Sequence, residues 1–336
     1  MMSDGTPAVS VIVLNYNGCR WLEGCLSSLA AQDFQSLEVI LVDNQSSDAS
    51  IALVTERFPW VRVLALDRNT GFSGGNNAGA RIARGRFLAF LNNDAEADGH
   101  WISALTSALD TSPQAGLATS LVVYLHDPSI VDSAGDGYAR WGGAFKRRHG
   151  QPDSGDRDTV EVFGACGAAC MIRRDVFDQL GGFDEDLFLV YEDVDLSYRA
   201  QLRDHRCLYV PDARVRHAGS ATMGTVSRTS VFHGQRNLEW VYFTNTPLRL
   251  LLRTLPGHVL YALAGGLYLA WSGHFGTWLA AKWAALAGLP SVLRKRRVVQ
   301  RSRSTDVRRL WNVMDRRWVA LKWREKRFDL GKAPSR

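Results

Sequence analysis

Three carboxylates stand within four residues of one another, at Glu192, Asp193 and Asp195. Side chains this close repel one another, and the pKa of one of them rises unless a cation or a helix dipole compensates. The residues that follow predict a helix over 192–203, which places all three in its first turn, where the helix dipole favours negative charge. A carboxylate that faces a crevice from a helix N-terminus can act as a general base, although acidic first turns also occur without a catalytic role.

Two further aspartates follow short apolar runs, Asp43 after 37–42 and Asp94 after 87–91. A carboxylate at Asp94 can hold a hard divalent cation, which in turn neutralises a diphosphate. Asp43 can accept hydrogen bonds from a nucleobase or a ribose. His217 is a candidate metal ligand. Because a lone histidine is more often structural than a ligand, it becomes a metal ligand only where the fold brings it beside Asp94.

The elements that must position these side chains alternate in type along the chain. Four short apolar runs are typical of buried strands and lie at 9–14, 37–42, 61–66 and 87–91. Helices are expected between them, near 21–29, 49–58 and 73–84. This alternation predicts a parallel sheet with helices on both faces. In such sheets, ligands bind beyond the carboxyl ends of the strands.

Polar clusters end three of the four predicted strands, at Asn15-Tyr16-Asn17, Asp43-Asn44 and Asn92-Asn93-Asp94. Asn and Asp favour turns in any protein, but three clusters at successive strand ends favour one shared ligand crevice. The glycine-rich segment 69–79, which contains Gly71, Asn76 and Asn77, lets the backbone approach a ligand closely. It is not the glycine pattern of dinucleotide-binding proteins, and that pattern is absent after the first strand, so a hydride-transfer enzyme is disfavoured.

The middle of the chain is less regular. Strands are expected at 115–124, 160–172, 207–210 and 215–217, and helices at 175–180 and 229–244. The segment 128–158 is rich in Gly, Asp and Arg and predicts a long loop.

Composition narrows the class of protein. The 336 residues are 46% hydrophobic and 22% charged, which excludes a disordered chain, a collagen-like chain and a bundle of many membrane spans. The five cysteines lack the spacing of a zinc site or a disulfide scaffold, so we expect them to be reduced and mostly buried. We expect no signal peptide at the N-terminus and a cytoplasmic location for the body of the protein.

Two C-terminal features favour contact with a membrane. Residues 254–281 contain no Asp, Glu, Lys or Arg, but their glycines and histidines favour helices in the membrane interface over a simple span. A helical hairpin packed on the domain is the alternative.

Residues 291–336 carry 16 Lys or Arg and 4 Asp or Glu. Apolar residues recur there at helical spacing, at Val307, Leu310, Trp311, Met314, Trp318 and Leu321. A basic helix with Trp on its apolar face is typical of an anionic membrane surface. Nucleic-acid binding competes as an explanation, but the neighbouring apolar stretch favours the membrane, and we expect no nucleic-acid partner.

The chain resembles the family-2 inverting glycosyltransferases between residues 7 and 245. Five segments occur in the order found in that family, at 9–17, 42–48, 69–79, 91–94 and 192–199. Within it, the chain is similar to bacterial rhamnosyltransferase-like members that build cell-surface polysaccharides. The resemblance implies the A-type glycosyltransferase fold, an α/β fold with a Rossmann-like nucleotide-binding sheet and helices on both faces. We therefore expect a catalytic domain over 7–245, apolar membrane-interface helices over 246–293 and a basic amphipathic tail over 294–336.

The resemblance also implies an activity. The expected reaction is inverting transfer of a sugar, first of all rhamnose, from a nucleotide diphosphate to a lipid-linked or polysaccharide acceptor at the cytoplasmic face of the cell membrane. The implied cofactor is a divalent cation, Mg²⁺ or Mn²⁺. Two alternatives stay open. A non-catalytic membrane-bound nucleotide-sugar-binding protein has no need of the Glu192–Asp193 pair, and a sugar nucleotidyltransferase normally has a basic, glycine-rich segment after its first strand.

Site residues follow from the family's motifs. Asp193 is the expected catalytic base, with Glu192 before it in the same acidic motif. Asp94 and His217 are the expected metal ligands, and Asn92 stands where the usual two-aspartate motif has its first acid. Donor binding is expected of eight residues: Asn15, Asn17, Asp43, Asn44, Gly71, Asn76, Asn77 and Asn93.

Overall fold

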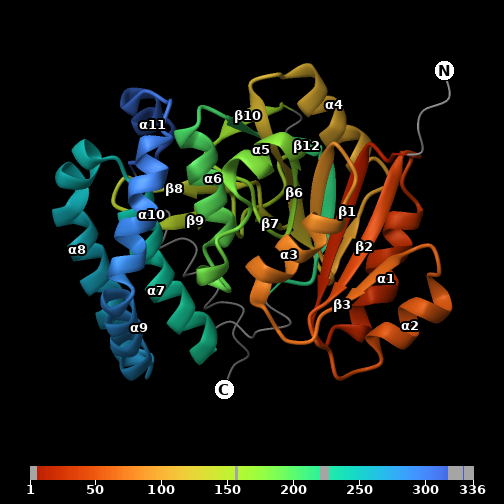
Figure 1. Ribbon diagram of the computed structural model, residues 1–336, viewed down its shortest axis with the longest axis horizontal. Coiled ribbons are helices and arrows are strands. Elements are labelled where there is room, and N and C mark those ends of the chain that lie inside the picture. The colour runs from red at the N-terminus through yellow and green to blue at the C-terminus, as the bar shows by residue number, and fades with distance from the viewer. Residues whose placement is uncertain (1–5, 156–157, 220–226, 317–327, 329–336) are drawn as a thin grey trace.

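The computed structural model describes residues 6–155, 158–219, 227–316 and Phe328. Figure 1 shows a twisted central sheet with helices on both faces and, beyond one edge of it, a layer of long helices from the C-terminal part of the chain. In the described residues the strands of the main path lie in the order β10-β12-β6-β11-β4-β1-β2-β3. The predicted α/β architecture is confirmed.

The first half of the sheet is parallel, as the sequence predicts. Its strands are β1 (Val9–Asn15), β2 (Leu37–Asp43), β3 (Arg62–Ala65) and β4 (Phe87–Asn92). The connecting helices are α1 (Cys19–Ala30), α2 (Ser50–Arg57) and α3 (Gly71–Ile82). Asn15 pairs with Asp43, and Leu14 pairs with Asn92. The polar strand ends therefore meet at one edge.

The second half of the sheet mixes directions. β11 (Ala169–Arg173) runs antiparallel to β4, and β12 (Arg206–His217) runs parallel to β6 (Ala115–Tyr124). β10 (Val160–Val162) is the edge strand beside β12. Two three-residue strands lie off this path, β5 (Ala95–Ala97) against β12 and β7 (Val131–Ser133) against β6. The helices of this half are α4 (Trp101–Thr111), α5 (Arg174–Leu180), the 3₁₀ helix η1 (Glu185–Leu187) and α6 (Glu192–Leu202).

Three sequence predictions in this half are wrong in detail. The two short strands at 207–210 and 215–217 are one strand, β12, whose register shifts between Val210 and Arg214. Pro211 lies in that shift, and since it donates no hydrogen bond it imitates a strand break in the sequence. The run 160–172 divides into β10 and β11.

The third correction concerns the predicted loop at 128–158, which contains three strands: β7 and the hairpin of β8 (Asp136–Tyr138) and β9 (Ala144–Lys146). Each has three residues, too few for the alternation that identifies a strand.

The sheet has an apolar core on each face. Val11 and Val13 of β1 pack on the face covered by α1 and α4, with Leu22 and Trp101. Ile12, between them, packs on the opposite face with residues of α3, α5 and α6. Alternate strand residues entering opposite cores explain why the central strands are apolar throughout.

The C-terminal layer contains α7 (Arg228–Asn245), α8 (Leu248–Trp271), α9 (Phe275–Ala287), α10 (Leu289–Arg301) and α11 (Val307–Val313). In the described part of the chain, α8 alone is long and apolar enough to cross a membrane. By length and composition alone, that is weak support for a membrane-associating segment.

One C-terminal expectation needs correction. Leu310 and Met314, predicted to face a membrane, are buried in a third core together with Tyr138 and Tyr198. A side chain that packs against the protein's own aromatic residues is not available to lipid. The continuation of that stripe, at Trp318 and Leu321, lies outside the described residues.

Candidate active site

The carboxyl ends of β1, β2 and β4 are joined by a hydrogen-bonded amide and carboxylate network. The side-chain amide of Asn15 donates to Oδ1 of Asp43 at 3.1 Å, and the amide of Asn93 donates to Oδ1 of Asn15 at 2.7 Å. Oδ2 of Asp43 accepts from the backbone N–H of Ser46 at 2.9 Å. The predicted convergence of the polar clusters is confirmed, and it fixes the orientation of the Asp43 carboxylate.

Asn17 lies at the exposed rim of this network. Its backbone has a φ of +50°, and its Oδ1 accepts from the backbone N–H of Ser47 at 2.8 Å. The turn after β1 is thereby tied to the turn after β2.

Several amides expected near a donor are used inside the protein. Oδ1 of Asn44 accepts from the backbone N–H of Thr70 at 2.8 Å, and its amide donates to the carbonyl of Gly71 at 3.1 Å. Asn76 donates to the Phe72 carbonyl of its own helix at 3.0 Å. These bonds shape the start of α3.

Asn77 and Gly71 hold the segment that precedes α6. Asn77 donates to the Phe183 carbonyl and accepts from the Phe183 N–H, both at 2.9 Å. Gly71 has a φ of +72°, and a Cβ there would collide with the Phe188 backbone. The Phe188 carbonyl accepts from the N–H of Phe72 at 2.7 Å. These residues therefore bring the glycine-rich helix and the acidic motif together.

The fold brings His217 beside Asp94. Nε2 of His217, the last residue of β12, lies 3.1 Å from Oδ1 of Asp94, just after β4. On the other side of the ring, Nδ1 lies 2.9 Å from Oδ2 of Asp132 in β7. This contact directs Nε2 toward Asp94, which is how histidine ligands are usually oriented.

Sequence reasoning missed Asp132, which lay within the predicted loop. Its carboxylate is buried and also contacts Lys146 Nζ at 2.8 Å and His149 Nδ1 at 3.3 Å. Burial raises the pKa of Asp132, but Lys146 and the two histidines outweigh it and hold the pKa well below its usual range. No local pattern separates Asp132 from the other aspartates of this glycine- and aspartate-rich segment, so the sequence alone offered no signal for it.

The carboxylates near His217 also change its titration. Burial lowers the pKa of His217, but hydrogen bonds to Asp132 and Asp94 outweigh burial and raise the pKa to about 9. The two carboxylates hold the ring in one orientation between β4 and β7.

Asp193 is linked to the end of β4 through hydrogen bonds of two adjacent residues, Gly167 and Ala168. Its Oδ2 accepts from the backbone N–H of Gly167 at 2.8 Å, and its Oδ1 accepts from the N–H of Val194 at 2.7 Å. The carbonyl of the next residue, Ala168, accepts from the N–H of Asn92 at 2.9 Å. The carboxylate is half-buried and stands at the same edge of the sheet as Asp94.

The two acids that begin α6 differ in environment. Glu192 is buried, and its Oε2 has no hydrogen-bond partner in the described part of the chain. Burial, and after it the nearby charge of Asp193, raises the pKa of Glu192 well above its usual range. Burial also raises the pKa of Asp193, opposed by the N–H groups of Gly167 and Val194. Of the two, Asp193 has the donors that stabilise a carboxylate.

The third acid of the cluster, Asp195, is used structurally. It contacts Nε of Arg199 at 2.7 Å and accepts from the Asn245 amide at 2.7 Å.

The backbone before α6 is strained and is held from α7. Phe188, Val190 and Tyr191 all have positive φ, at 64°, 65° and 79°. The Asn237 amide donates to the carbonyls of Leu187, Leu189 and Val190 at 2.7–2.9 Å. Positive φ in residues other than glycine persists only where its surroundings impose it. Asn237, which sequence analysis did not select, is thus a positioning residue for Glu192 and Asp193.

The residues at the strand ends fit a divalent cation whose remaining ligands come from a substrate. No cluster of three or more His, Cys, Asp or Glu side chains in the described ranges is arranged to hold a metal by itself. Asp94 and His217 together offer one carboxylate oxygen and one oriented ring nitrogen. Mg²⁺ is usually held by one or two carboxylates plus substrate phosphates and water, and Asp94 supplies one such carboxylate.

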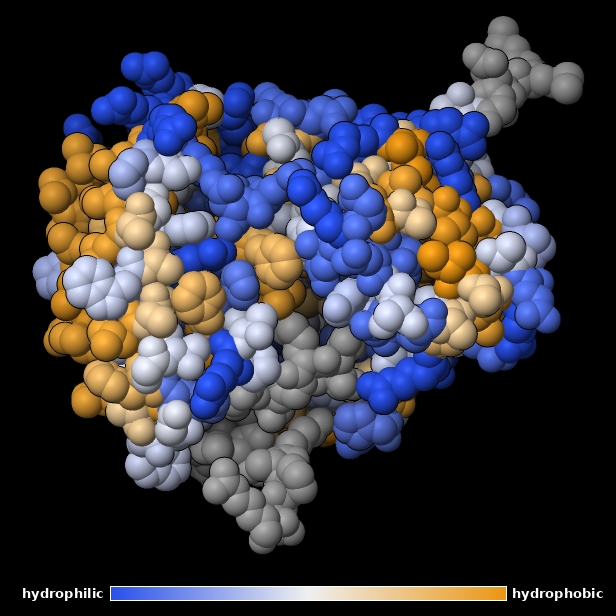
Figure 2. All heavy atoms as spheres, turned by 60° about the horizontal axis from the view of Figure 1, so that its bottom comes forward, coloured by the Kyte–Doolittle hydropathy of each residue, from blue (hydrophilic) through white to orange (hydrophobic). Residues whose placement is uncertain are grey.

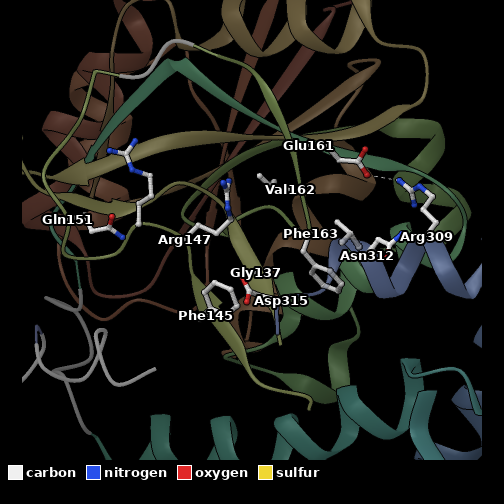
Figure 3. Close-up of a pocket in the computed structure, with 12 residues that line it drawn as sticks. Gly137, Phe145, Arg147, Gln151, Glu161, Val162, Phe163, Arg309, Asn312 and Asp315 are labelled. Atoms are coloured by element: carbon white, nitrogen blue, oxygen red, sulfur yellow. Dashed lines mark hydrogen bonds and ion pairs between the residues drawn. The ribbon is translucent and has the colours of Figure 1, made fainter. Parts of the chain in front are cut away.

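A cavity of about 610 Å³ lies elsewhere, between β9, β10 and α11 (Figure 3). Phe145, Arg147, Glu161 and Arg309 are among the residues that line it. It includes none of the predicted site residues, so this cavity is separate from the candidate active site.

The family model described as "Glycosyl transferase family 2" matches residues 10–181. The chain belongs to this family. The matched region contains the donor network and Asp94, and it ends before the acidic motif. The transferase is 28% identical, over 289 residues, to the N-acetylglucosaminyl-diphospho-decaprenol L-rhamnosyltransferase of Mycobacterium tuberculosis, a match that covers 74% of this chain and 90% of the relative.

Solved structures share the fold of the transferase. A mannosyltransferase from Pyrobaculum calidifontis in complex with GDP-Man and Mn²⁺ aligns with a TM-score of 0.54 and 18% identity, covering 95% of this chain and 87% of that one. GalNAc-T7 with UDP, GalNAc and Mn²⁺ aligns with a TM-score of 0.56 and 16% identity, covering 76% of this chain and 55% of that one. The transferase therefore has the A-type glycosyltransferase fold.

Proposed function

We propose that the transferase moves a sugar, with rhamnose as the first candidate, from a nucleotide diphosphate to a lipid-linked or polysaccharide acceptor in cell-surface glycan synthesis, with inversion at the anomeric carbon. The observation that carries the proposal is the short link between the acidic motif and the end of β4. Asp193 bonds to Gly167, and the adjacent Ala168 bonds to Asn92, two residues before Asp94. A base and a diphosphate site at one sheet edge are what a single displacement requires.

Asp193 acts as the base in this proposal. Its carboxylate takes the proton of an acceptor hydroxyl, whose oxygen forms a bond to the anomeric carbon while the bond from that carbon to the diphosphate oxygen breaks. One base opposite one leaving group inverts the configuration. General-base assistance of this kind contributes about 10²- to 10⁴-fold, and the orientation of the two bound substrates supplies much of the remainder.

The strand-end residues receive the donor in this proposal. Asp43, fixed by Asn15 and Ser46, accepts hydrogen bonds from the nucleobase or the ribose. Asp94 and His217 would hold a divalent cation, Mg²⁺ or Mn²⁺, which when bound supplies positive charge to the leaving diphosphate.

The rhamnose assignment is supported by the mycobacterial relative, whose name states an L-rhamnosyl transfer to a diphospho-decaprenol acceptor. A lipid-linked acceptor also suits the outer surface of α8. Leu252, Leu267 and Trp271 are 66%, 76% and 79% exposed, and Figure 2 shows hydrophobic residues gathered over the side of the molecule that α8 and α9 form.

Two polar residues in the middle of α8, Thr254 and His258, face the protein instead. Nε2 of His258 lies 2.8 Å from Glu239, and Thr254 lies 2.8 Å from the Tyr242 hydroxyl. In a surface helix of a soluble protein the apolar face is usually buried, whereas the leucines of the outer surface of α8 are exposed. We propose a peripheral position at the cytoplasmic face of the membrane, with α8 and α9 toward the lipid, and the exposed apolar surface of α8 supports contact with lipid.

Incubation of the full chain with UDP-, GDP- and dTDP-linked sugars, each with and without Mn²⁺, tests the proposal. The acceptor is a polyprenyl-diphosphate-linked N-acetylglucosamine. We expect one donor to give a metal-dependent glycosylated product of inverted configuration, and dTDP-rhamnose is the first candidate. Binding of a nucleotide sugar without product would favour the non-catalytic alternative, and product of retained configuration would exclude Asp193 as a single-displacement base.

A further inference from the structure

The C-terminal helices carry charge of one sign. Residues 247–301, which include α8, α9 and α10, contain no Asp or Glu and eight Lys or Arg. Lys282 pairs with Glu239 and Lys295 with Asp184 and Asp186 on neighbouring elements. Exposed arginines of these helices that lack such a partner repel one another, so a surface that gathers them favours an anionic ligand.

Four of the arginines in this part of the chain, together with Arg303 just after it, line one groove. It has a volume of about 870 Å³ and lies between the first turn of α8 and the second half of α10. Among the residues that the structure describes, no acidic side chain lines it, and the arginines are Arg249, Arg296, Arg297, Arg301 and Arg303.

Two of these arginines are structural. Arg296 donates to the carbonyls of Phe243 and Thr246 at 2.6 and 2.7 Å, where it closes the end of α7. Arg303 donates to the Thr305 carbonyl at 2.9 Å.

The other three are available to a ligand. Arg249, Arg297 and Arg301 are exposed and form no hydrogen bond or ion pair within the described residues. Three guanidinium groups around one groove, none of them neutralised, match the donor geometry and charge that a phosphate group needs.

Apolar side chains border the same groove. Leu248 and Leu293 line it and are exposed, and Val298 on α10 is 68% exposed. Leu248 also begins the outward apolar surface of α8 that continues through Leu252 and Leu267. Basic groups beside an outward apolar surface are typical of the boundary between lipid tails and headgroups.

We propose that this groove binds the phosphate headgroup of an anionic phospholipid in the bilayer on which α8 and α9 lie. The inference rests on the membrane position in the proposed function and deepens it. The apolar surface enters the acyl boundary, and Arg249, Arg297 and Arg301 reach the phosphates at its edge. The adjoining leucines favour lipid over nucleic acid, whose single strands need exposed aromatic platforms for stacking.

Vesicle co-sedimentation of the full chain tests the groove. Phosphatidylcholine vesicles with and without phosphatidylglycerol are compared for wild type and for Arg297→Gln/Arg301→Gln. A basic residue near an anionic surface contributes about fivefold to binding, so the double variant should bind phosphatidylglycerol vesicles about 25-fold more weakly. Its binding to pure phosphatidylcholine should be unchanged.

Two further variants act as controls. Arg297→Lys/Arg301→Lys keeps the charge and should retain most of the binding. Arg62→Gln/Arg68→Gln removes the same charge at and just after β3, at the far edge of the sheet from α8, and should bind like wild type (Figure 1). Thermal unfolding of each variant verifies that it is folded.

The possible failures are distinguishable. Equal binding of wild type to neutral and anionic vesicles would overturn the groove while leaving the membrane position intact. Loss of binding to both vesicle types in the double variant, or release of wild type by millimolar inorganic phosphate, would also overturn it. Absence of vesicle binding in wild type would overturn both the groove and the membrane position, whereas transfer to a soluble acceptor analogue would still test the proposed chemistry.

Discussion

His217 and Asp132 are 85 residues apart in the chain and are joined by a 2.9 Å contact between Nδ1 and Oδ2. Because Asp132 occupies one ring nitrogen, the other faces Asp94 at 3.1 Å. The orientation of the His217 ring is thus fixed by Asp132, which lies in β7, a strand of three residues.

Asp132→Asn should weaken the binding of Mn²⁺, measured by calorimetric titration in the presence of a nucleoside diphosphate. Loss of a group that orients a ligand typically lowers metal affinity about 10- to 100-fold. Because Asp132 also contacts Lys146, thermal unfolding must show that the variant is folded. Asp110→Asn, which breaks an exposed pair with Arg86, is the matched control and should bind the metal normally.

Asp193→Asn should leave donor binding intact and lower the transfer rate more than about a hundredfold, since asparagine accepts no proton. Isothermal titration with the nucleotide and a single-turnover assay separate the two effects. A rate within a few fold of wild type would remove Asp193 from the mechanism.

Glu192→Gln should change the pH dependence of stability. The folded-state pKa of Glu192 is raised well above its usual range, first by burial and then by Asp193. Unfolding therefore releases a proton, and wild type loses stability as the pH rises from the unfolded pKa of about 4.3 through the raised folded value. Glutamine does not titrate, so in urea unfolding at several pH values the variant should gain stability relative to wild type across this window. A constant difference would contradict a raised pKa.

Asn237→Ala should destabilise the protein and reduce turnover together. It removes the amide donor from the carbonyls of Leu187, Leu189 and Val190, of which Leu187 keeps a hydrogen bond from Arg236. An unsatisfied buried polar group typically costs about 1–3 kcal/mol. Urea unfolding measures the first effect, and kcat measures the second. Asn312→Ala, at an exposed position on α11, should change stability by less than about 0.5 kcal/mol.

Leu263→Glu/Leu267→Glu should move the protein from membranes to the soluble fraction. Both leucines are exposed on the outer surface of α8, so a charge there opposes lipid contact without disturbing a core. Cell fractionation followed by immunoblotting of an epitope tag measures how the protein divides between the membrane and soluble fractions. Unchanged membrane recovery in a folded variant would place the contact elsewhere.

Much of the fold was predictable because its signals are local. The apolar runs of β1, β2 and β4 and the polar residues that end them determine a parallel sheet and the edge where its side chains meet. Asp193 could also be selected from its motif alone. Periodicity and strand-end polarity act over a few residues, which is the range that a single sequence reveals.

The tertiary structure decided which partners the predicted site residues have inside the protein. Asn76 and Asn77 resemble donor ligands in sequence, but their amides bond to Phe72 and Phe183. Asp132 and Asn237 carry no local signal, because their partners lie many residues away and are met only after β7 and α7 have packed. The sequence likewise did not determine which side of α8 is exposed. Composition fixes how apolar a helix is, whereas packing of the helix against the rest of the protein decides which side faces out.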